Sequence, residues 1–210
     1  VVTVRDTSIT RYQKGGLILD GNVRFDASGL TVGRGSGPNG EANDGIAANG
    51  VQISRGAHGS LTDSRVAPNH YKDPATAAAT GILVWDAGKV TLARNIVSGA
   101  TGDAGIDVSE DGSYGTATDV IVSCTLVQLT GAVSPLSYGV SNSDSSSLAL
   151  RDSTVTGFAT NVSGTTATTG NGDCLAPAPK VKAFASGHTV DVVWSRAAAP
   201  AYAPVSGIEV

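Results

Sequence analysis

Apolar and polar residues recur along this chain in one short pattern: an apolar residue, two variable residues, a small polar residue, one variable residue and a second apolar residue. The pattern fits six times, with first positions 21 to 36 residues apart. A period in this range is typical of solenoids, in which each repeat stacks on the next. The copies are Val4…Thr7…Ile9, Phe25…Ser28…Leu30, Leu61…Ser64…Val66, Leu92…Asn95…Val97, Val122…Thr125…Val127 and Leu150…Ser153…Val155.

A second signal lies between most copies, a glycine that leads an alternation of apolar residues, as in Gly81–Val84 and Gly105–Val108. A third short run, such as Lys89–Leu92, leads into the next copy. Alternation with a period of two predicts strands, and no segment carries the 3.6-residue stripe of a crossover helix. The sequence therefore predicts an all-β parallel β-helix with three short strands in each turn.

The small polar residue of each copy is expected where the chain turns a corner between two strands. Stacked turns lie about 4.8 Å apart, so these side chains would form a ladder that hydrogen-bonds the backbone of neighbouring turns. The expected ladder is Thr7, Ser28, Ser64, Asn95, Thr125 and Ser153.

Composition and charge narrow the possible partners. The 210 residues include 27 glycines, no methionine and 15% charged residues, which suits short strands and tight turns. The net charge of −4 gives no basic surface for nucleic acid. No apolar run approaches the roughly 20 residues of a membrane span. The strand pattern is already present at Val1, which suggests a mature or shortened chain.

The six copies and the glycine-led strands resemble the right-handed parallel β-helix proteins of the pectin-lyase-like class. The resemblance covers residues 1–165 and implies about six rungs, a secreted or cell-surface location and a polysaccharide or cell-surface glycan as partner. Its members include lyases, hydrolases and proteins without known chemistry. The paired aspartates and basic motifs of the polygalacturonases are missing. Gly56-Ala57-His58-Gly59 resembles one of these motifs only superficially.

Beyond the repeats, residues 166–178 have the composition of a linker. Residues 179–210 resemble the opening of a fibronectin type III module, with Trp194 as its core tryptophan and Ile208 where that family usually has tyrosine. This would be a partial β-sandwich. The two cysteines, Cys124 and Cys174, have no metal-ligand spacing. Either they form a disulfide that ties a folded-back cap to the solenoid, or both are free thiols.

Candidate sugar-binding residues come from aligning the glycine-led strands. The alignment predicts two outward rows, one with Leu83, Asp107 and Ser141 and one with Trp85, Ser109 and Ser143. An outward tryptophan beside carboxylates is typical of a platform on which sugar rings stack. In the alternative interpretation, the ring is covered by a loop or by the C-terminal segment, and the acids are solvated charges. The candidates are Arg55, His70, Tyr71, Lys72, Trp85, Asp86, Asp107 and Glu110.

No cofactor is required by these patterns, and Ca²⁺ is the one ion that the acidic residues suggest. Asp103, Asp107, Glu110 and Asp111 offer hard oxygens but do not match a calcium-loop spacing. Three functions compete at this point. The favoured one is a non-catalytic extracellular module that binds glycans or associates with other copies. The others are a polysaccharide lyase or glycoside hydrolase, acting on an acidic or neutral chain, and a subunit of a filament stacked through the solenoid ends.

Overall fold

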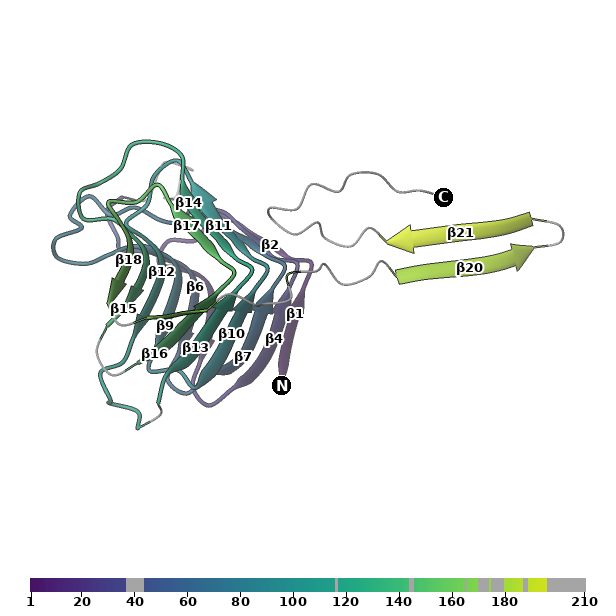
Figure 1. The fold of residues 1–210 in the computed structure, drawn as a ribbon, viewed down its shortest axis with the longest axis horizontal. Helices are drawn as coiled ribbons and strands as arrows, with labels where there is room; N and C mark the ends of the chain where they lie inside the picture. Colours follow the sequence, from purple (N-terminus) through teal and green to yellow (C-terminus); the bar gives the residue numbers. More distant parts are fainter. Residues whose placement is uncertain are drawn as a thin grey trace.

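A computed structural model of the chain describes residues 1–36, 44–115, 117–143, 146–164, 166–169, 174, 180–186 and 189–195. Its main body is a parallel β-solenoid made of three parallel sheets, which we name A, B and C (Figure 1). Within each sheet, consecutive neighbours are three elements apart in the chain, as a coil with three strands per turn requires. This confirms the all-β, parallel, three-strand prediction.

The strands of each sheet follow one another along the solenoid axis. Sheet A contains β1 (Val2–Arg5), β4 (Arg24–Ser28), β7 (His58–Thr62), β10 (Lys89–Ala93), β13 (Asp119–Ser123), β16 (Ser147–Arg151) and β19 (Ala167–Thr169). Sheet B contains β2 (Ser8–Ile9), β5 (Thr31–Val32), β8 (Arg65–Val66), β11 (Ile96–Gly99), β14 (Leu126–Leu129) and β17 (Thr154–Thr156). Sheet C contains β3 (Gly15–Asp20), β6 (Asn49–Ser54), β9 (Thr80–Trp85), β12 (Ala104–Ser109), β15 (Tyr138–Asn142) and β18 (Thr160–Gly164). In sheets B and C four strands have a neighbour on both sides, so about four turns are stacked between others.

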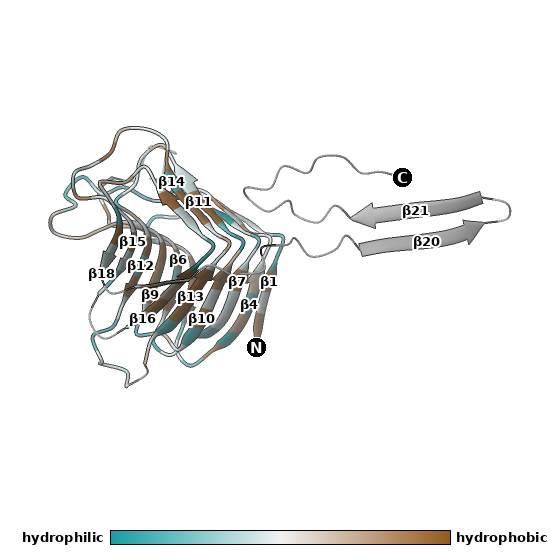
Figure 2. Cartoon of the chain, in the orientation of Figure 1, coloured by the Kyte–Doolittle hydropathy of each residue, from teal (hydrophilic) through white to brown (hydrophobic). Residues whose placement is uncertain are grey.

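The core is a set of columns, each built from the same inward position of successive turns. In sheet C one column passes through Val51, Ile82, Ile106 and Val140, all without exposed surface. Sheets A and B add columns of leucine and valine from the expected positions. Figure 2 shows both apolar and polar residues on the strands of the solenoid.

The leading glycines of sheet C are required by close packing. A Cβ on Gly105 would lie 2.5 Å from the carbonyl oxygen of Gly139 and 2.4 Å from Cγ1 of Val127. Gly81 has the same surroundings one turn earlier, with its virtual Cβ 2.7 Å from the Gly105 oxygen. A side chain here would push adjacent turns apart, so the glycines permit the turn spacing.

The corner between sheets A and B has the same backbone conformation in six turns. The residue before each corner side chain has a positive φ, between 44° and 66°, which L-residues other than glycine seldom adopt. Five of the six N–H groups donate to a carbonyl oxygen of the next turn, at 2.9 to 3.2 Å. The six residues are Asp6, Gly29, Asp63, Arg94, Cys124 and Asp152.

The predicted polar ladder is present at this corner from Ser64 onward. Ser64 Oγ accepts from Leu30 N at 3.0 Å, and Asn95 Oδ1 accepts from Ser64 N at 3.0 Å. Thr125 Oγ1 accepts from Asn95 N at 3.3 Å, and Ser153 Oγ accepts from Thr125 N at 3.1 Å.

The second copy of the pattern was misaligned by two residues. Val4 pairs with Ala27, not with Phe25, and Ala27 pairs in turn with Leu61. The corner position of that turn is therefore Leu30, which is 1% exposed, and Ser28 lies on the outer face. The pattern tolerated both alignments because Phe25 and Ala27 are both apolar and both face the core.

A disulfide joins the chain after the solenoid back to the solenoid. Cys124 and Cys174 form a disulfide, with 5.3 Å between their Cα atoms. The predicted pairing is therefore present, and it fixes the start of the C-terminal segment to the corner between sheets A and B. Beyond it, β20 (Lys180–Ser186) and β21 (Thr189–Ser195) form an antiparallel hairpin. The third strand predicted for a fibronectin-like module falls outside the described residues.

No helix among the described residues is long and apolar enough to cross a membrane.

Candidate functional site

The outer face of sheet C carries the two rows that the alignment predicted. Asp107 pairs with Leu83 on one side and with Ser141 on the other, and Trp85 pairs with Ser109. Ser141 donates a hydrogen bond to the Asp107 carboxylate. The face is therefore polar along β12 and β15 and aromatic at the end of β9.

Trp85 lies where β9 ends, next to an aromatic residue that the sequence reading missed. Tyr114, in the loop that follows β12, meets its ring edge to face, with centroids 5.9 Å apart and planes at 80°. The guanidinium of Arg55 lies 5.7 Å from the centroid of the Tyr114 ring. Trp85 is half-buried and Tyr114 is 48% exposed. The available signal was a tyrosine in a glycine-rich turn, Asp111–Gly115, one turn beyond the tryptophan.

Arg55 is held by Asp20 of the preceding turn. Its Nε donates to Asp20 Oδ1 at 2.6 Å and its Nη2 to Oδ2, a bidentate pair that Ser54 extends by donating to Oδ1 at 2.7 Å. The contact between the two side chains lowers the pKa of Asp20 and raises the pKa of Arg55. Both side chains are partly exposed, so the pair contributes little to stability and serves mainly to orient Arg55 against Tyr114.

Asp86, expected as an outward carboxylate, is buried with 1% exposure. The residue has a φ of 46°, and this left-handed turn directs its side chain under the loop after β12. Oδ1 accepts from Asp111 N at 2.9 Å and from Gly112 N at 3.2 Å. Asp86 therefore anchors the loop that carries Tyr114 and does not face a ligand.

His70, Tyr71 and Lys72 lie in the loop between β8 and β9, and Asp103 holds that loop in place. The buried Asp103 carboxylate contacts His70 Nδ1 at 2.7 Å and accepts from Tyr71 N at 2.8 Å and Ala79 N at 3.1 Å. Asp103 precedes β12, whereas Trp85 pairs with the last residue of that strand. Six residues of strand separate the two places by roughly 20 Å.

The four acids suggested for Ca²⁺ are not gathered in one place. Asp103 anchors the β8–β9 loop, Asp107 accepts from Ser141, and Glu110 Oε2 accepts from Thr118 N at 2.9 Å. Asp111 has the Asp86 carboxylate beside it. Among the residues that the structure describes, no group of three or more His, Cys, Asp or Glu side chains is arranged to hold a metal ion.

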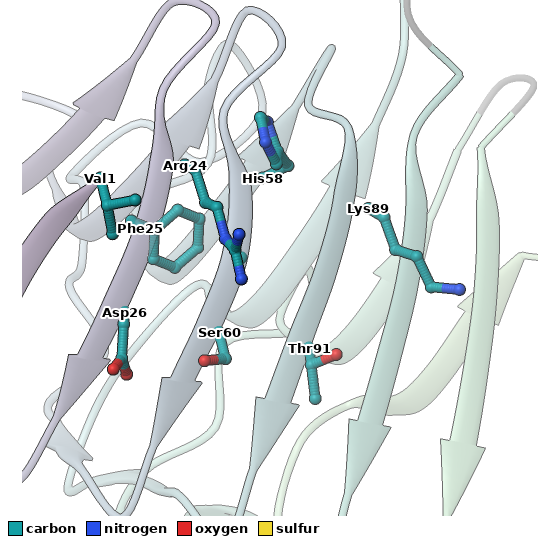
Figure 3. Close-up of a pocket in the computed structure, with 9 residues that line it drawn as sticks. Val1, Arg24, Phe25, Asp26, His58, Ser60, Lys89 and Thr91 are labelled. Carbon is teal, nitrogen blue, oxygen red and sulfur yellow. The ribbon is translucent and has the colours of Figure 1, made fainter.

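A cavity of about 690 Å³ lies on sheet A, around the corner from Trp85. Arg24, His58 and Lys89 occupy equivalent outward positions at the start of β4, β7 and β10. Ser60 and Thr91 stand one row further along the strands. Figure 3 shows the Arg24 guanidinium extending over β7 and Lys89 extending away from it. Sequence reasoning missed this row because it considered only the glycine-led strands.

Acidic side chains neutralise the row of Arg24, His58 and Lys89 only weakly. Lys89, whose side chain is 71% exposed, has its ammonium 3.9 Å from Asp119, and Asp26 is paired with Arg5. His58 Nδ1 lies 3.1 Å from the carbonyl oxygen of Gly56, a contact that fits an N–H on Nδ1. The cavity thus combines two cations with an imidazole between them.

Comparisons with known proteins identify no relative of this chain. The chain matches no protein-family model, no curated protein and no solved structure. The molecule is therefore classified by its fold alone, as a parallel β-solenoid.

Proposed function

We propose that this solenoid is a non-catalytic extracellular module that binds glycans, with Trp85 and Tyr114 as its sugar-contacting platform. The observation that carries the proposal is the perpendicular pair of rings at 5.9 Å, half-open to solvent at the end of a regular sheet. Sugar rings have an apolar C–H face and a polar rim, so an aromatic corner with polar neighbours is complementary to them. Arg55 and Asp20 provide those polar neighbours.

The surrounding side chains support a preformed site. Asn49, Gln52, Ser54 and Asp20 are joined by a chain of hydrogen bonds that runs along β6 to the end of β3. Side chains held in this way lose little freedom on binding, and this favours recognition by a rigid surface. The platform is therefore proposed as a binding site.

The test is a glycan array followed by affinity measurement on the Trp85→Ala and Tyr114→Ala variants. Both variants should lose most of the binding, since each removes one wall of the corner. Tyr71→Ala is the matched control, because the Asp103 contact uses its backbone N–H and not its ring. Binding that survives Trp85→Ala but is lost in Tyr71→Ala would move the site to the β8–β9 loop. The absence of any glycan ligand would contradict the proposal.

The basic row on sheet A favours a second candidate, a polysaccharide lyase that acts on an acidic chain. Arg24 and Lys89 would neutralise a sugar carboxylate, which makes the proton on the adjacent carbon more acidic. His58 Nε2 would take that proton as the neighbouring C–O bond breaks and a C=C double bond forms, and the departing sugar oxygen would take a proton from water. Incubation with acidic polysaccharides, followed by ultraviolet absorbance of the unsaturated ends, tests this candidate. His58→Ala must abolish any activity seen; if the wild-type chain gives no absorbance change, the candidate fails.

Finer features of the architecture belong to the same proposal. We propose that the coil is right-handed and that residues 179–210 begin a fibronectin type III-like module, of which β20 and β21 would be the first two strands. Ca²⁺ binding stays a prediction, to be tested by calorimetric titration, although the four acids suggested for it do not form one ligand set. Self-association through the solenoid ends stays a prediction, tested by sizing over a range of concentrations.

A further inference from the structure

Asp20 and Arg55 stand side by side at the edge of the aromatic platform, and both side chains reach solvent. Asp20 is 29% exposed and Arg55 is 43% exposed. The Arg55 guanidinium lies 5.7 Å from the centroid of the Tyr114 ring, which is itself 5.9 Å from the centroid of the Trp85 ring. A sugar ring on the platform therefore lies close to one carboxylate and one guanidinium.

The two side chains keep hydrogen-bonding capacity after they have bonded to each other. Arg55 donates to Asp20 through Nε and Nη2, which leaves further N–H groups on the guanidinium. Each carboxylate oxygen has two lone pairs, and Asp20 Oδ2 uses one of them for Arg55. Contact with Arg55 lowers the pKa of Asp20, so the carboxylate is ionised and only accepts in neutral solution. Donors and an acceptor therefore remain for a ligand, directly beside each other.

Two neighbouring hydroxyl groups on a sugar ring complement this arrangement of donors and acceptor. A hydroxyl group both donates and accepts, so one hydroxyl can donate to the carboxylate while its neighbour accepts from the guanidinium. A sugar carboxylate fits less well, because it only accepts and would have to displace Asp20 from its bidentate contact with Arg55. The paired side chains therefore favour a neutral sugar over an anionic one.

The other charged groups near the platform have the same effect. Glu110 and Asp111 directly follow β12, whose last residue pairs with Trp85. Among the residues that the structure describes, no ion pair reaches either of these acids. Their negative charges repel an anionic ligand that approaches the rings, whereas the positive charge of Arg55 is already balanced by Asp20.

We propose that the platform selects neutral glycans that present two adjacent free hydroxyl groups, and that Asp20 and Arg55 bind this pair of hydroxyls. The inference rests on the proposed function, because it assigns a ligand class to the same site. Trp85 and Tyr114 contact the apolar face of the sugar ring. Asp20 accepts a hydrogen bond from one hydroxyl, and Arg55 donates to the next. Asp20 and Arg55 are thus the residues that determine specificity.

The experiment compares oligomers of cellulose, mannan and galactan of equal length, each with two modified counterparts. One counterpart is oxidised to carboxylates at its primary hydroxyls, and the other is O-methylated at its adjacent secondary hydroxyls. Calorimetric titration is run on the full chain and on Trp85→Ala, and only binding lost in Trp85→Ala is assigned to the platform. At least one neutral oligomer should bind. Its carboxylated counterpart should bind at least about tenfold more weakly, and its methylated counterpart about tenfold to a hundredfold more weakly.

Substitution of the pair tests its role directly. Asp20→Asn should weaken binding of the neutral oligomer about tenfold and reduce its advantage over the methylated counterpart, whereas a merely structural effect would weaken both by the same factor. Arg55→Lys is a second variant, since it keeps the charge and loses the planar fork that binds Asp20. Asp63→Asn is the matched control, because Asp63 holds Arg94 through an equivalent bidentate pair at the corner between sheets A and B. It should leave glycan binding unchanged.

The outcomes separate this specificity from the platform itself. If a carboxylated oligomer binds the platform as tightly as the neutral one, the specificity is overturned and the platform stands. Unchanged discrimination in both Asp20→Asn and Arg55→Lys has the same consequence. If none of the neutral oligomers shows binding that depends on Trp85, the specificity is overturned as well, and the glycan array decides whether the platform binds any sugar. Neutral preference that both variants reduce supports the inference.

Discussion

Substitution of Asn95 is the most direct test of the polar ladder. It has no exposed surface, and its side chain serves two neighbouring segments. Oδ1 accepts from Ser64 N at 3.0 Å, and Nδ2 donates to the Leu61 oxygen at 2.9 Å. Asn95→Ala would leave the Ser64 N–H buried without a partner and would remove one bond from Leu61.

The magnitude follows from these two contacts. An unsatisfied buried N–H costs about 1–3 kcal/mol, and a lost hydrogen bond to a carbonyl costs about 0.5–1.5 kcal/mol. We therefore expect Asn95→Ala to lower the free energy of unfolding by roughly 2–4 kcal/mol. The matched control is Asn95→Ser, because Ser64 and Ser153 make the same contact with the preceding turn through a hydroxyl, at 3.0 and 3.1 Å. The serine variant should lose about 1 kcal/mol, the contact to Leu61 alone.

Urea unfolding followed by far-ultraviolet circular dichroism measures both variants. The reasoning requires alanine to cost clearly more than serine. If the two variants unfold at the same urea concentration, the side-chain bond to Ser64 contributes nothing measurable, and the ladder is a consequence of turn stacking and not one of its causes.

Two further changes probe turn spacing and the C-terminal tether. Gly105→Ala should destabilise the solenoid by about 1–3 kcal/mol or more, since the new methyl group would overlap the Gly139 oxygen and Val127; Gly45→Ala, whose virtual Cβ has no neighbour within 4 Å, should be nearly neutral in the same unfolding assay. Reduction of Cys124–Cys174, which closes a separation of 50 residues, should cost up to about 4 kcal/mol. A Cys124→Ala, Cys174→Ala double variant that is indifferent to reductant is its control, and an unchanged midpoint on reducing the wild-type chain would contradict that estimate.

The fold was predictable because its signal repeats. Apolar residues at alternate positions define a strand and its buried face, and their return every few tens of residues defines a coil without any knowledge of contacts. The error at Phe25 shows the limit of this reasoning. Two apolar residues at alternate positions, Phe25 and Ala27, satisfy the same pattern, and only the left-handed corner at Gly29 decides between them.

The candidate site was only partly predictable. The row containing Trp85 follows from strand register, which the alignment supplied. Tyr114 does not, because its place depends on how the loop after β12 folds back, and that in turn depends on the Asp86 side chain. Asp86 was expected to face outward, but it follows the outward Trp85, and its side chain is buried. Sequence patterns assign faces to regular strands, but they do not follow a side chain through a turn.

The distribution of chemistry on the solenoid has a physical cause. Inward positions and the corner ladder contact both neighbouring turns, so packing and hydrogen bonding restrict their residues from two sides. Corner loops between sheets C and A face solvent on one side, and each can differ from the next without disturbing the strands. Asp20, Arg55, Asp86 and Asp111 occupy successive versions of this corner, and each contacts the turn beside it. Distinct surface contacts can therefore arise by varying one corner of a repeat whose core stays fixed.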